Sequence, residues 1–242
     1  MKILAIDSSG LVASAAVTEN GILTAEYTVN YKKTHSQTLL PMIDEIVRMT
    51  ELDLETVDAI AVAGGPGSFT GLRIGSATAK GLGLALDKPL ISVPTVDALA
   101  YNLYGAAGLI CPMMDARRAQ VYTGIYRFCG ADFQTALEQR AEAVEDMAAR
   151  LNGMGQPVIL LGDGAVVYED RLRELLQVPW SMAPAHVNRQ RAGAVAALAE
   201  KYFAEGKTET AAEHRPEYLR LSQAERERAQ REKAKQEREV RP

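Results

Sequence analysis

Short apolar runs separated by polar turns dominate the first hundred residues. The run "KILAID" (residues 2–7) predicts an apolar strand that ends at Asp7, and alternating segments follow at residues 11–18 and 22–29. The pair Asn20-Gly21 between those two segments is a strong signal for a tight hairpin. The runs at 58–63 and 89–93 are almost wholly apolar, which is typical of parallel strands buried on both faces. Together these runs predict a mixed sheet.

Two helices are predicted between these strands. The first begins after Thr34, with Gln37 as a capping-box partner, and its apolar face contains Leu39, Leu40, Ile43, Ile46 and Val47. The second follows "GGPGSFTG" and runs to about residue 86, with Ser68 as the residue that caps its start.

Small residues recur at every fourth position of the second helix. They are Gly67, Gly71, Gly75, Ala79 and Gly83. An interior glycine destabilises a helix by about 1 kcal/mol relative to alanine, so the bare ridge calls for a reason. The ridge could pack on the chain's own sheet or on the first helix. We expect the helix to have two neighbours, one inside the protein and one on another chain.

The second half of the chain repeats the plan of the first. The run "LICPMMD" (109–115) ends at Asp115 as "KILAID" ends at Asp7, and an alternating segment, a turn at 129–132 and another extended stretch follow. The run "PVILLGDGA" (157–165) then gives a buried strand, a glycine loop and a helix. This predicts an α/β protein made of two duplicated lobes, residues 1–105 and 106–220, and a polar charged tail at 221–242.

Two such lobes would place Asp7 and Asp115 across a shared cleft. Carboxylates that hold magnesium, with glycine-loop amides near phosphate, suit a nucleotide site, which is the general plan of the actin-like, sugar-kinase and Hsp70 ATPases. The match is incomplete, because "DSSG" delays the first glycine to Gly10 and Asp163 would repel phosphate. A working ATPase and an inherited cleft without turnover both remain open. The residues predicted for this vestigial cleft are Asp7, Ser8, Asp115, Gly162 and Gly164.

Composition narrows the class of protein. The formal net charge of −4 gives no global basic field, and no apolar run reaches the length of a membrane span. The N-terminus is a strand rather than a signal peptide, and Cys111 and Cys129 are expected to be buried free thiols. These features predict a cytoplasmic protein without a membrane partner. The tail after Leu221 is expected to be solvated, with an RNA-binding arm as the lesser alternative.

Histidine is too sparse for a metal site of the usual kind. His35, His186 and His214 are far apart in the sequence and form no HxxH or HxxxH pair, so no metal ligands are predicted. Ser68 does not lie in a GxSxG elbow, which argues against a serine hydrolase. No catalytic residue is therefore assigned.

Several blocks together resemble the bacterial TsaB family. They are "KILAIDSS", "HSQTLLPMI", "AVAGGPGSFTGLRIGSATAKGLGLAL", "SVPTVDALA", "MMDARRAQVYTGIY", "LGDGA" and "RPEYLR", which together span residues 1 to about 220. The resemblance implies a two-lobed actin-like (ASKHA) fold. It also implies a part in making threonylcarbamoyl-adenosine next to the anticodon of ANN-reading tRNAs.

The resemblance implies a non-catalytic role for the chain. It would bind and stabilise TsaD, the transferase subunit, while the ATPase TsaE joins through that pair and tRNA is reached indirectly. No cofactor is required by the chain itself, and ATP or ADP with magnesium belongs to the complex. TsaD-type proteins carry an HxxxH metal motif where this chain has Thr95 and Leu99, so the old metalloprotease label is disfavoured.

The helix after Thr34 and the glycine-ridged helix are the surfaces implied for TsaD, and a homodimer is implied through the same patch when TsaD is absent. The residues predicted to form this contact are His35, Leu39, Ser68, Phe69, Gly71, Leu72, Gly75 and Ala79. The main alternative is an enzyme, a small ATPase or kinase that uses Asp7 and Asp115 around magnesium.

Overall fold

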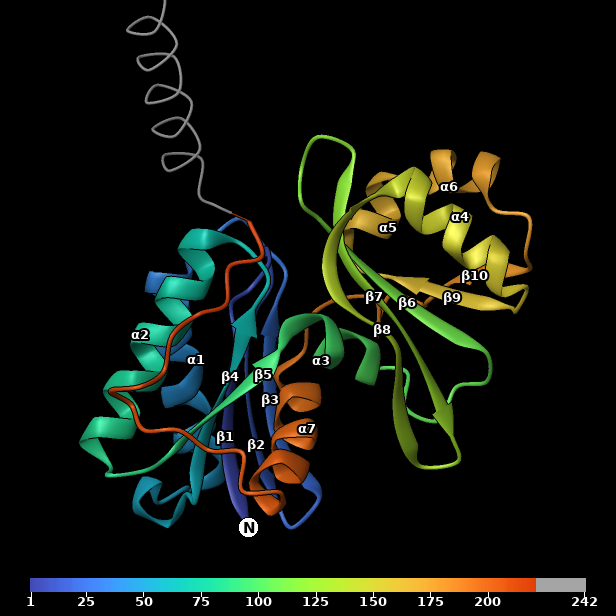
Figure 1. Ribbon diagram of the computed structural model, residues 1–242. Coiled ribbons are helices and arrows are strands. Elements are labelled where there is room, and N and C mark those ends of the chain that lie inside the picture. The colour runs from blue at the N-terminus through green and yellow to red at the C-terminus, as the bar shows by residue number, and fades with distance from the viewer. Residues whose placement is uncertain (221–242) are drawn as a thin grey trace, which may run out of the picture.

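The protein consists of two lobes, each built on a five-stranded mixed sheet (Figure 1). The computed structural model describes residues 1–220. The strands of the first sheet are β1 (Lys2–Asp7), β2 (Ala13–Glu19), β3 (Ile22–Val29), β4 (Ala59–Gly65) and β5 (Leu90–Pro94). Those of the second are β6 (Leu109–Asp115), β7 (Gln120–Cys129), β8 (Asp132–Ala143), β9 (Val158–Leu161) and β10 (Trp180–Met182).

The two sheets have the same topology. Their strand orders are β3-β2-β1-β4-β5 and β8-β7-β6-β9-β10. Strand β1 pairs antiparallel with β2 and parallel with β4, and β6 pairs in the same way with β7 and β9. The predicted duplication of an α/β lobe is therefore confirmed.

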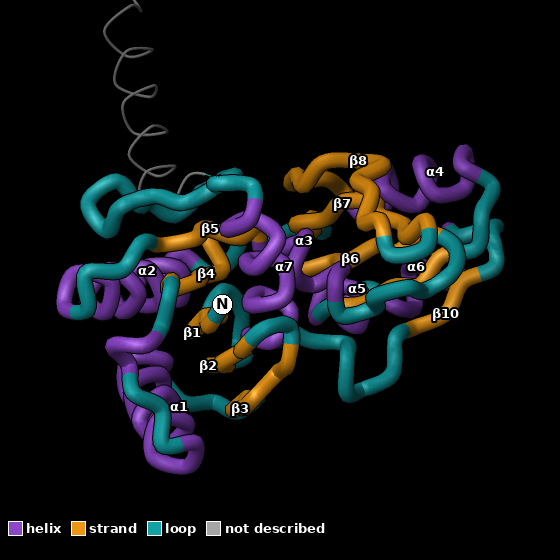
Figure 2. Tube along the Cα trace, turned by 90° about the horizontal axis from the view of Figure 1, so that it is seen from below, coloured by secondary structure: helices purple, strands orange, loops and turns teal. Residues whose placement is uncertain are grey.

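Helices cover both faces of the first sheet. Figure 2, seen from below, places α1 (His35–Thr50) and α2 (Phe69–Ala85) on the outer side, and α3 (Thr95–Tyr101) and α7 (Ala192–Ala204) on the side of the second lobe. The second lobe carries α4 (Val144–Met154), α5 (Asp163–Val167) and α6 (Glu169–Leu175) on one face, and a 3-10 turn at Leu54–Thr56 precedes β4. Among residues 1–220, no helix is long and apolar enough to cross a membrane.

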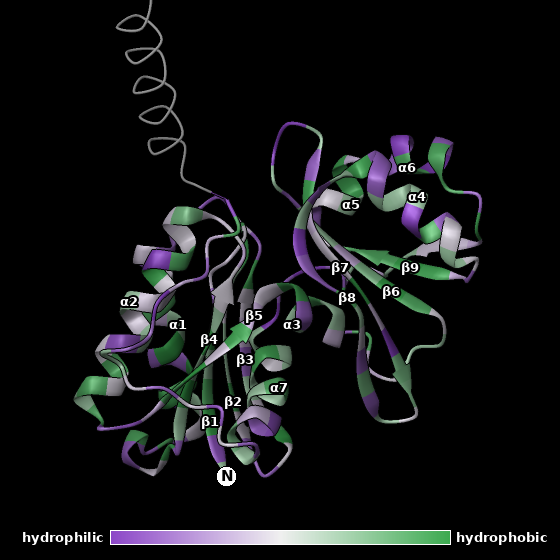
Figure 3. Cartoon of the chain, in the orientation of Figure 1, coloured by the Kyte–Doolittle hydropathy of each residue, from purple (hydrophilic) through white to green (hydrophobic). Residues whose placement is uncertain are grey.

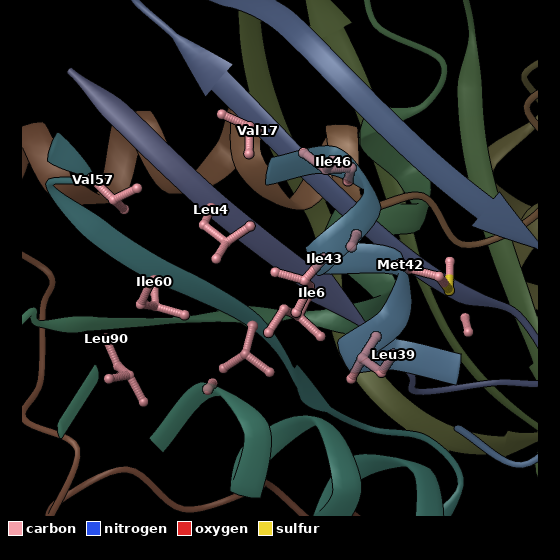
Figure 4. Close-up of a cluster of buried hydrophobic side chains, with 14 of the residues drawn as sticks. Leu4, Ile6, Val17, Leu39, Met42, Ile43, Ile46, Val57, Ile60 and Leu90 are labelled. Carbon is pink, nitrogen blue, oxygen red and sulfur yellow. The ribbon is translucent and has the colours of Figure 1, made fainter. Parts of the chain in front are cut away.

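The main core of the first lobe lies between its sheet and α1. Leu39, Ile43 and Ile46 of α1 pack on Leu4 and Ile60 of the sheet, and all five are buried (Figure 4). The hydropathy colouring distinguishes the strands from one another. Strands β4 and β9 are mainly hydrophobic, whereas β8 is largely hydrophilic (Figure 3). The apolar periodicity of the sequence thus determines which face of each element is inside.

Helix α7 shows that the predicted second lobe, residues 106–220, extends too far along the chain. Val195 and Leu198 of α7 are buried in the cluster that contains Ile3 of β1, so α7 belongs to the first lobe. The reason is that the apolar run "AGAVAALA" needs a sheet face, and that face of the first sheet is available to it. The predicted tail at 221–242 lies outside the described residues.

Residues 209–220 form a further return to the first lobe, which we call the C-terminal strap. The strap begins with a bridge in which Leu90 and Glu209 exchange backbone hydrogen bonds of 2.8 and 2.9 Å. It then runs beside α2, where Lys80 Nζ donates to the carbonyl oxygen of His214 at 3.1 Å (Figure 1). The chain therefore ends its described part at the junction of the two lobes.

The glycine ridge of α2 packs on the chain's own backbone. A Cβ atom at Gly71 would lie 2.1 Å from the carbonyl oxygen of Ser8, and one at Gly67 would lie 2.4 Å from that of Ser9. A Cβ at Gly75 would lie 2.4 Å from the Ser8 hydroxyl oxygen. The expectation that this ridge receives another chain is therefore wrong, because the loop after β1 already occupies it.

The two predicted helix starts have different outcomes. The Ser68 hydroxyl accepts a hydrogen bond from the backbone N–H of Gly71 at 3.3 Å, which confirms it as the cap of α2. Thr34 precedes α1 but makes no side-chain capping bond, so the capping box with Gln37 is wrong. Cys111 is buried as expected, whereas Cys129 is exposed.

The ridge predicts opposite effects for two glycines of the same helix. Gly71→Ala should lower the free energy of unfolding by about 1 to 3 kcal/mol, because its Cβ meets backbone that cannot move aside. Gly81→Ala should raise it by about 0.5 to 1 kcal/mol, because no atom lies within 4 Å and alanine favours the helix. Urea unfolding of both variants measures this, and equal effects would contradict the assignment of the ridge.

Candidate functional site

The carboxyl ends of the central strands of both lobes meet at a cavity of about 310 Å³. The first lobe contributes the loop after β1 and the start of α2, and the second contributes the end of β6 with its following loop. The end of the strap lines a further side. The lining residues that bear on its chemistry are Ser9, Phe69, Asp115, Asp163, Tyr218 and Arg220.

Asp7 lies beneath this cavity rather than in its wall. The backbone N–H of Ser9 donates to Asp7 Oδ1 at 2.9 Å, and the Ser9 hydroxyl donates to the same oxygen at 2.6 Å. Burial raises the pKa of the Asp7 carboxyl from 3.8 to about 6, although these two hydrogen bonds and His35 favour the ionised form. The carboxyl therefore shapes the turn after β1 and does not face the cavity.

Asp115 does line the cavity, but its own lobe already engages it. The Tyr168 hydroxyl donates to Asp115 Oδ1 at 3.1 Å, and the backbone N–H of Arg117 donates to the same atom at 2.8 Å. The Arg117 guanidinium lies 3.3 Å from Asp115 Oδ2. Asp163, whose pKa burial raises, accepts from the backbone N–H of Asp115 at 3.3 Å. Two carboxylates thus face this side of the cavity, which disfavours phosphate there.

Of the five predicted cleft residues, only Asp115 lines the cavity. Ser8 is buried and donates its hydroxyl to the carbonyl oxygen of Gly71 at 2.9 Å. Gly162 and Gly164 lie against the backbone at the end of β6, where a Cβ at Gly162 would be 2.2 Å from the carbonyl oxygen of Met113. The prediction that Asp7, Ser8, Gly162 and Gly164 line the cleft is therefore wrong, because all four are packed against the chain's own backbone.

The strap supplies the residues that sequence reasoning missed. The backbone N–H of Glu217 donates to the carbonyl oxygen of Gly64 at 2.7 Å, at the carboxyl end of β4. The Tyr218 ring lies 4.9 Å from that of Phe69, and Arg73 Nε donates to the Tyr218 hydroxyl at 3.3 Å. Arg220 Nη1 donates to the carbonyl oxygen of Ala116 at 2.6 Å. The block "RPEYLR" was visible in the sequence, but its destination in the fold was not.

The positions compared with a metal motif are structural. Thr95 is buried and its hydroxyl accepts the backbone N–H of Gly65 at 3.1 Å, and Leu99 is buried between the lobes. Within the described part of the chain, no group of three histidine, cysteine, aspartate or glutamate side chains is placed to hold a metal ion.

Most residues predicted for partner contact are inaccessible. Leu72 and Leu39 are 2% and 1% exposed, and Gly71, Gly75 and Ala79 are buried. The prediction is wrong for these five, because they face the loop after β1 and the core. Ser68 is exposed, Phe69 is half-buried, and His35 bonds through Nε2 to the carbonyl oxygen of Gly10 at 2.8 Å.

A different face of α2 is left uncovered by the described residues 1–220. We call it the outer α2 stripe, and it contains Thr70, Arg73, Ala77, Gly81 and Leu84, all exposed and spaced three or four residues apart. Within residues 1–220, no atom lies within 4 Å of a Cβ built at Gly81, and Leu84 is 70% exposed. Leu40 of α1 is also exposed. The residues in the middle of the stripe, Ala77 and Gly81, are small, and Leu84 at its end is apolar.

The sequence is similar to a set of tRNA-modification proteins. A family model described as TsaD, tRNA N6-adenosine threonylcarbamoyltransferase, matches residues 23–228. The tRNA threonylcarbamoyladenosine biosynthesis protein TsaB of Bacillus subtilis is 32% identical over 93% of this chain and 96% of its own length. Its counterpart in Escherichia coli is 30% identical over 91% and 95%.

Solved structures agree on the fold. YeaZ from Pseudomonas aeruginosa superposes with a TM-score of 0.78 at 28% identity, over 90% of this chain and 99% of that one. The ROK hexokinase of Thermus thermophilus superposes at 0.50 with 13% identity, over 85% and 100%, which shows shared architecture alone. The predicted two-lobed actin-like fold is therefore confirmed.

The raised pKa of Asp7 predicts a pH-dependent stability. Between about pH 4 and pH 6 the folded protein keeps a proton on Asp7 that the unfolded chain releases. The stability that the neutral carboxyl contributes is therefore fully present below this range and is lost above it. Asp7→Asn should therefore unfold with a free energy up to about 3 kcal/mol higher than wild type at about pH 7.5, and with little difference at about pH 4.

Urea unfolding across this pH range measures the effect. Asp170→Asn, at an exposed position of α6, is the control and should leave the pH profile unchanged. Burial also raises the pKa of Asp97 to about 6, so Asp97 changes the stability with pH in the same direction. This contribution should persist in the Asp7 variant. A variant destabilised equally at both pH values would contradict the assignment.

Proposed function

The chain belongs to the TsaB family and has a role in tRNA threonylcarbamoyladenosine biosynthesis, and on that premise we propose that it is a non-catalytic subunit that binds and stabilises TsaD. The observation that carries the proposal is the separation of two surfaces. The interlobe cavity is lined in part by the chain's own strap, whereas residues 1–220 leave the outer face of α2 uncovered.

The lack of catalysis is supported by what the residues in and beneath the cavity already do. Asp7 forms the turn after β1, and Asp115 is engaged by Tyr168 and Arg117. Glu217 and Tyr218 lie on Gly64 and Phe69, so the end of β4 is covered. A nucleotide that approached this point would have to displace the strap and face two carboxylates.

The outer α2 stripe is the surface we assign to TsaD. Small residues in the middle of an exposed helix let a second helix approach closely, and an apolar side chain at the end adds buried area. Arg73 is fixed at the other end of the stripe, with its guanidinium carbon 3.9 Å from the centre of the Phe69 ring. Leu40 and Met49 of α1, 56% and 69% exposed, extend the apolar surface.

The remaining partners are proposed from membership of the family. TsaE joins through the TsaB–TsaD pair, and ATP or ADP with magnesium acts at the level of the complex and is not required by this chain. Without TsaD, two copies of the chain would pair through the same stripe. Because TsaB relatives are tRNA-modification proteins, we assign the chain to the cytoplasm.

The main alternative is a small ATPase or kinase, favoured by the cavity between two actin-like lobes. It predicts that ATP with magnesium binds to the isolated chain and that Asp115→Asn abolishes this binding. We expect calorimetric titration to detect no binding tighter than about 1 mM, since phosphate would face Asp115 and Asp163. Micromolar binding that requires Asp115 would favour the enzyme.

The docking proposal is tested with two matched glycines. Gly81→Trp should weaken TsaD binding at least about tenfold, equivalent to about 1.4 kcal/mol, because a large side chain keeps the partner helix away. Gly153→Trp on α4 is the control, since that glycine is also helical with no atom within 4 Å.

Co-purification followed by calorimetry measures both variants, and thermal unfolding verifies that they are folded. Substitutions at Gly71 or Gly75 are unsuitable here because both glycines are buried against Ser8. Unchanged TsaD affinity for Gly81→Trp would rule out the outer α2 stripe as the contact.

A further inference from the structure

The loop between β6 and β7 has an unusual backbone. Arg117, Arg118 and Ala119 all have positive φ, at 65°, 59° and 54°, although none is glycine. L-amino acids avoid this region, and single occurrences are more usual than a run. Residues held in such conformations cluster at functional sites, so the loop warrants an explanation.

Contacts inside the chain hold this loop without using its arginine side chains to pack. The backbone N–H of Ala116 donates to the carbonyl oxygen of Gln120 at 2.9 Å, and that of Val144 donates to Ala119 at 3.2 Å. The side chain of Arg117 is 87% exposed despite its ion pair with Asp115. Within residues 1–220, Arg118 has no hydrogen bond or ion pair, and it is exposed.

The strap brings a third arginine to the same loop. Arg220 donates to the carbonyl oxygen of Ala116, the residue directly before Arg117, although 104 positions separate the two in sequence. The strap is held in place by Glu217 on Gly64 and by Tyr218 on Phe69 and Arg73. Three guanidinium groups are thus gathered where the sequence shows only a pair.

Neighbouring acidic groups neutralise one member of this cluster, because Arg117 is paired with Asp115, whereas Arg118 and Arg220 have no ion pair within residues 1–220. Glu142 Oε1 lies 2.7 Å from Arg150 Nε, and Glu145 Oε1 lies 3.2 Å from Arg171 Nε. Both acidic side chains near the start of α4 are therefore already paired. Asp115 and Asp163 line the cavity together with Arg117 and Arg220, whereas Arg118 lies outside that lining. An anion is therefore favoured at Arg118 and Arg220, whose charges have no acidic partner within residues 1–220.

We propose that Arg117, Arg118 and Arg220 form a contact site for the phosphodiester backbone of RNA. Guanidinium groups bind phosphate through paired N–H donors, and exposed arginines on a fixed loop can follow a backbone that lies across the surface. The choice of RNA over another phosphate rests on the proposed function, which places the chain beside a tRNA. The site adds direct contact to a role so far described through TsaD.

The test compares two double variants of the full chain in complex with TsaD. R117Q/R118Q removes two exposed guanidinium groups, of which only that of Arg117 is ion-paired, and R171Q/R173Q removes two exposed charges from α6 as a control. Fluorescence anisotropy with labelled tRNA is measured over a salt series. R117Q/R118Q should weaken binding at least about tenfold and make the slope of log K against log salt less negative by about 1.4 to 1.8. The control should change neither quantity.

Complex formation is measured first by size-exclusion chromatography, which separates this proposal from the docking proposal. If wild type does not bind TsaD, the docking proposal fails, and the same RNA titration on the isolated chain still tests the arginines. Unchanged RNA affinity and slope in R117Q/R118Q would overturn the RNA site, as would an equal loss in the control. A loss of ATP binding without a loss of RNA binding would reassign the arginines to a nucleotide, and loss of the complex would reassign them to TsaD.

Discussion

The close approach of α2 to the loop after β1 is the contact on which the rest of the structure depends. It places the backbone of a helix against the carbonyl oxygens of Ser8 and Ser9, a distance that only residues without side chains permit. The glycines that permit this contact lower the intrinsic helix propensity of α2 at several turns. Once α2 is fixed there, its small ridge is internal, and its opposite face is the one that other molecules can reach.

The strap extends this arrangement from the first lobe to the second. It pairs with β5, follows α2, covers the end of β4 and finishes on the loop after β6. A cavity that would hold a nucleotide in an actin-like enzyme is thereby bounded by the chain's own C-terminal segment. The buried carboxyl of Asp7 fits this picture, because it is retained at a position where ionisation lowers stability while its hydrogen bonds shape only a turn.

The two proposals use opposite ends of this framework. The outer α2 stripe offers a surface for a helix. The loop between β6 and β7, which we call the arginine loop because it carries Arg117 and Arg118, offers positive charge at the junction of the lobes. The Tyr218 hydroxyl accepts from Arg73 on the stripe, and Arg220, two residues later, reaches the arginine loop. One short segment therefore connects the two surfaces physically, which would keep a bound subunit and a bound RNA in a fixed relation.

The sequence by itself determined the elements, the duplication and the family, because apolar periodicity, the Asn20-Gly21 turn and the Ser68 cap are local or nearly local signals. It could not decide whether the glycine ridge packs on this chain or on another one. A ridge with no side chains suits an internal and an external neighbour equally well. It placed Asp7, Ser8, Gly162 and Gly164 in a cleft because each lies at or just after the end of a strand, whereas packing against the chain's own backbone keeps them out of the cavity wall. The return of α7 and of the strap, and with it the meeting of Arg220 and Ala116, depends on contacts across more than a hundred residues, which only the tertiary structure sets.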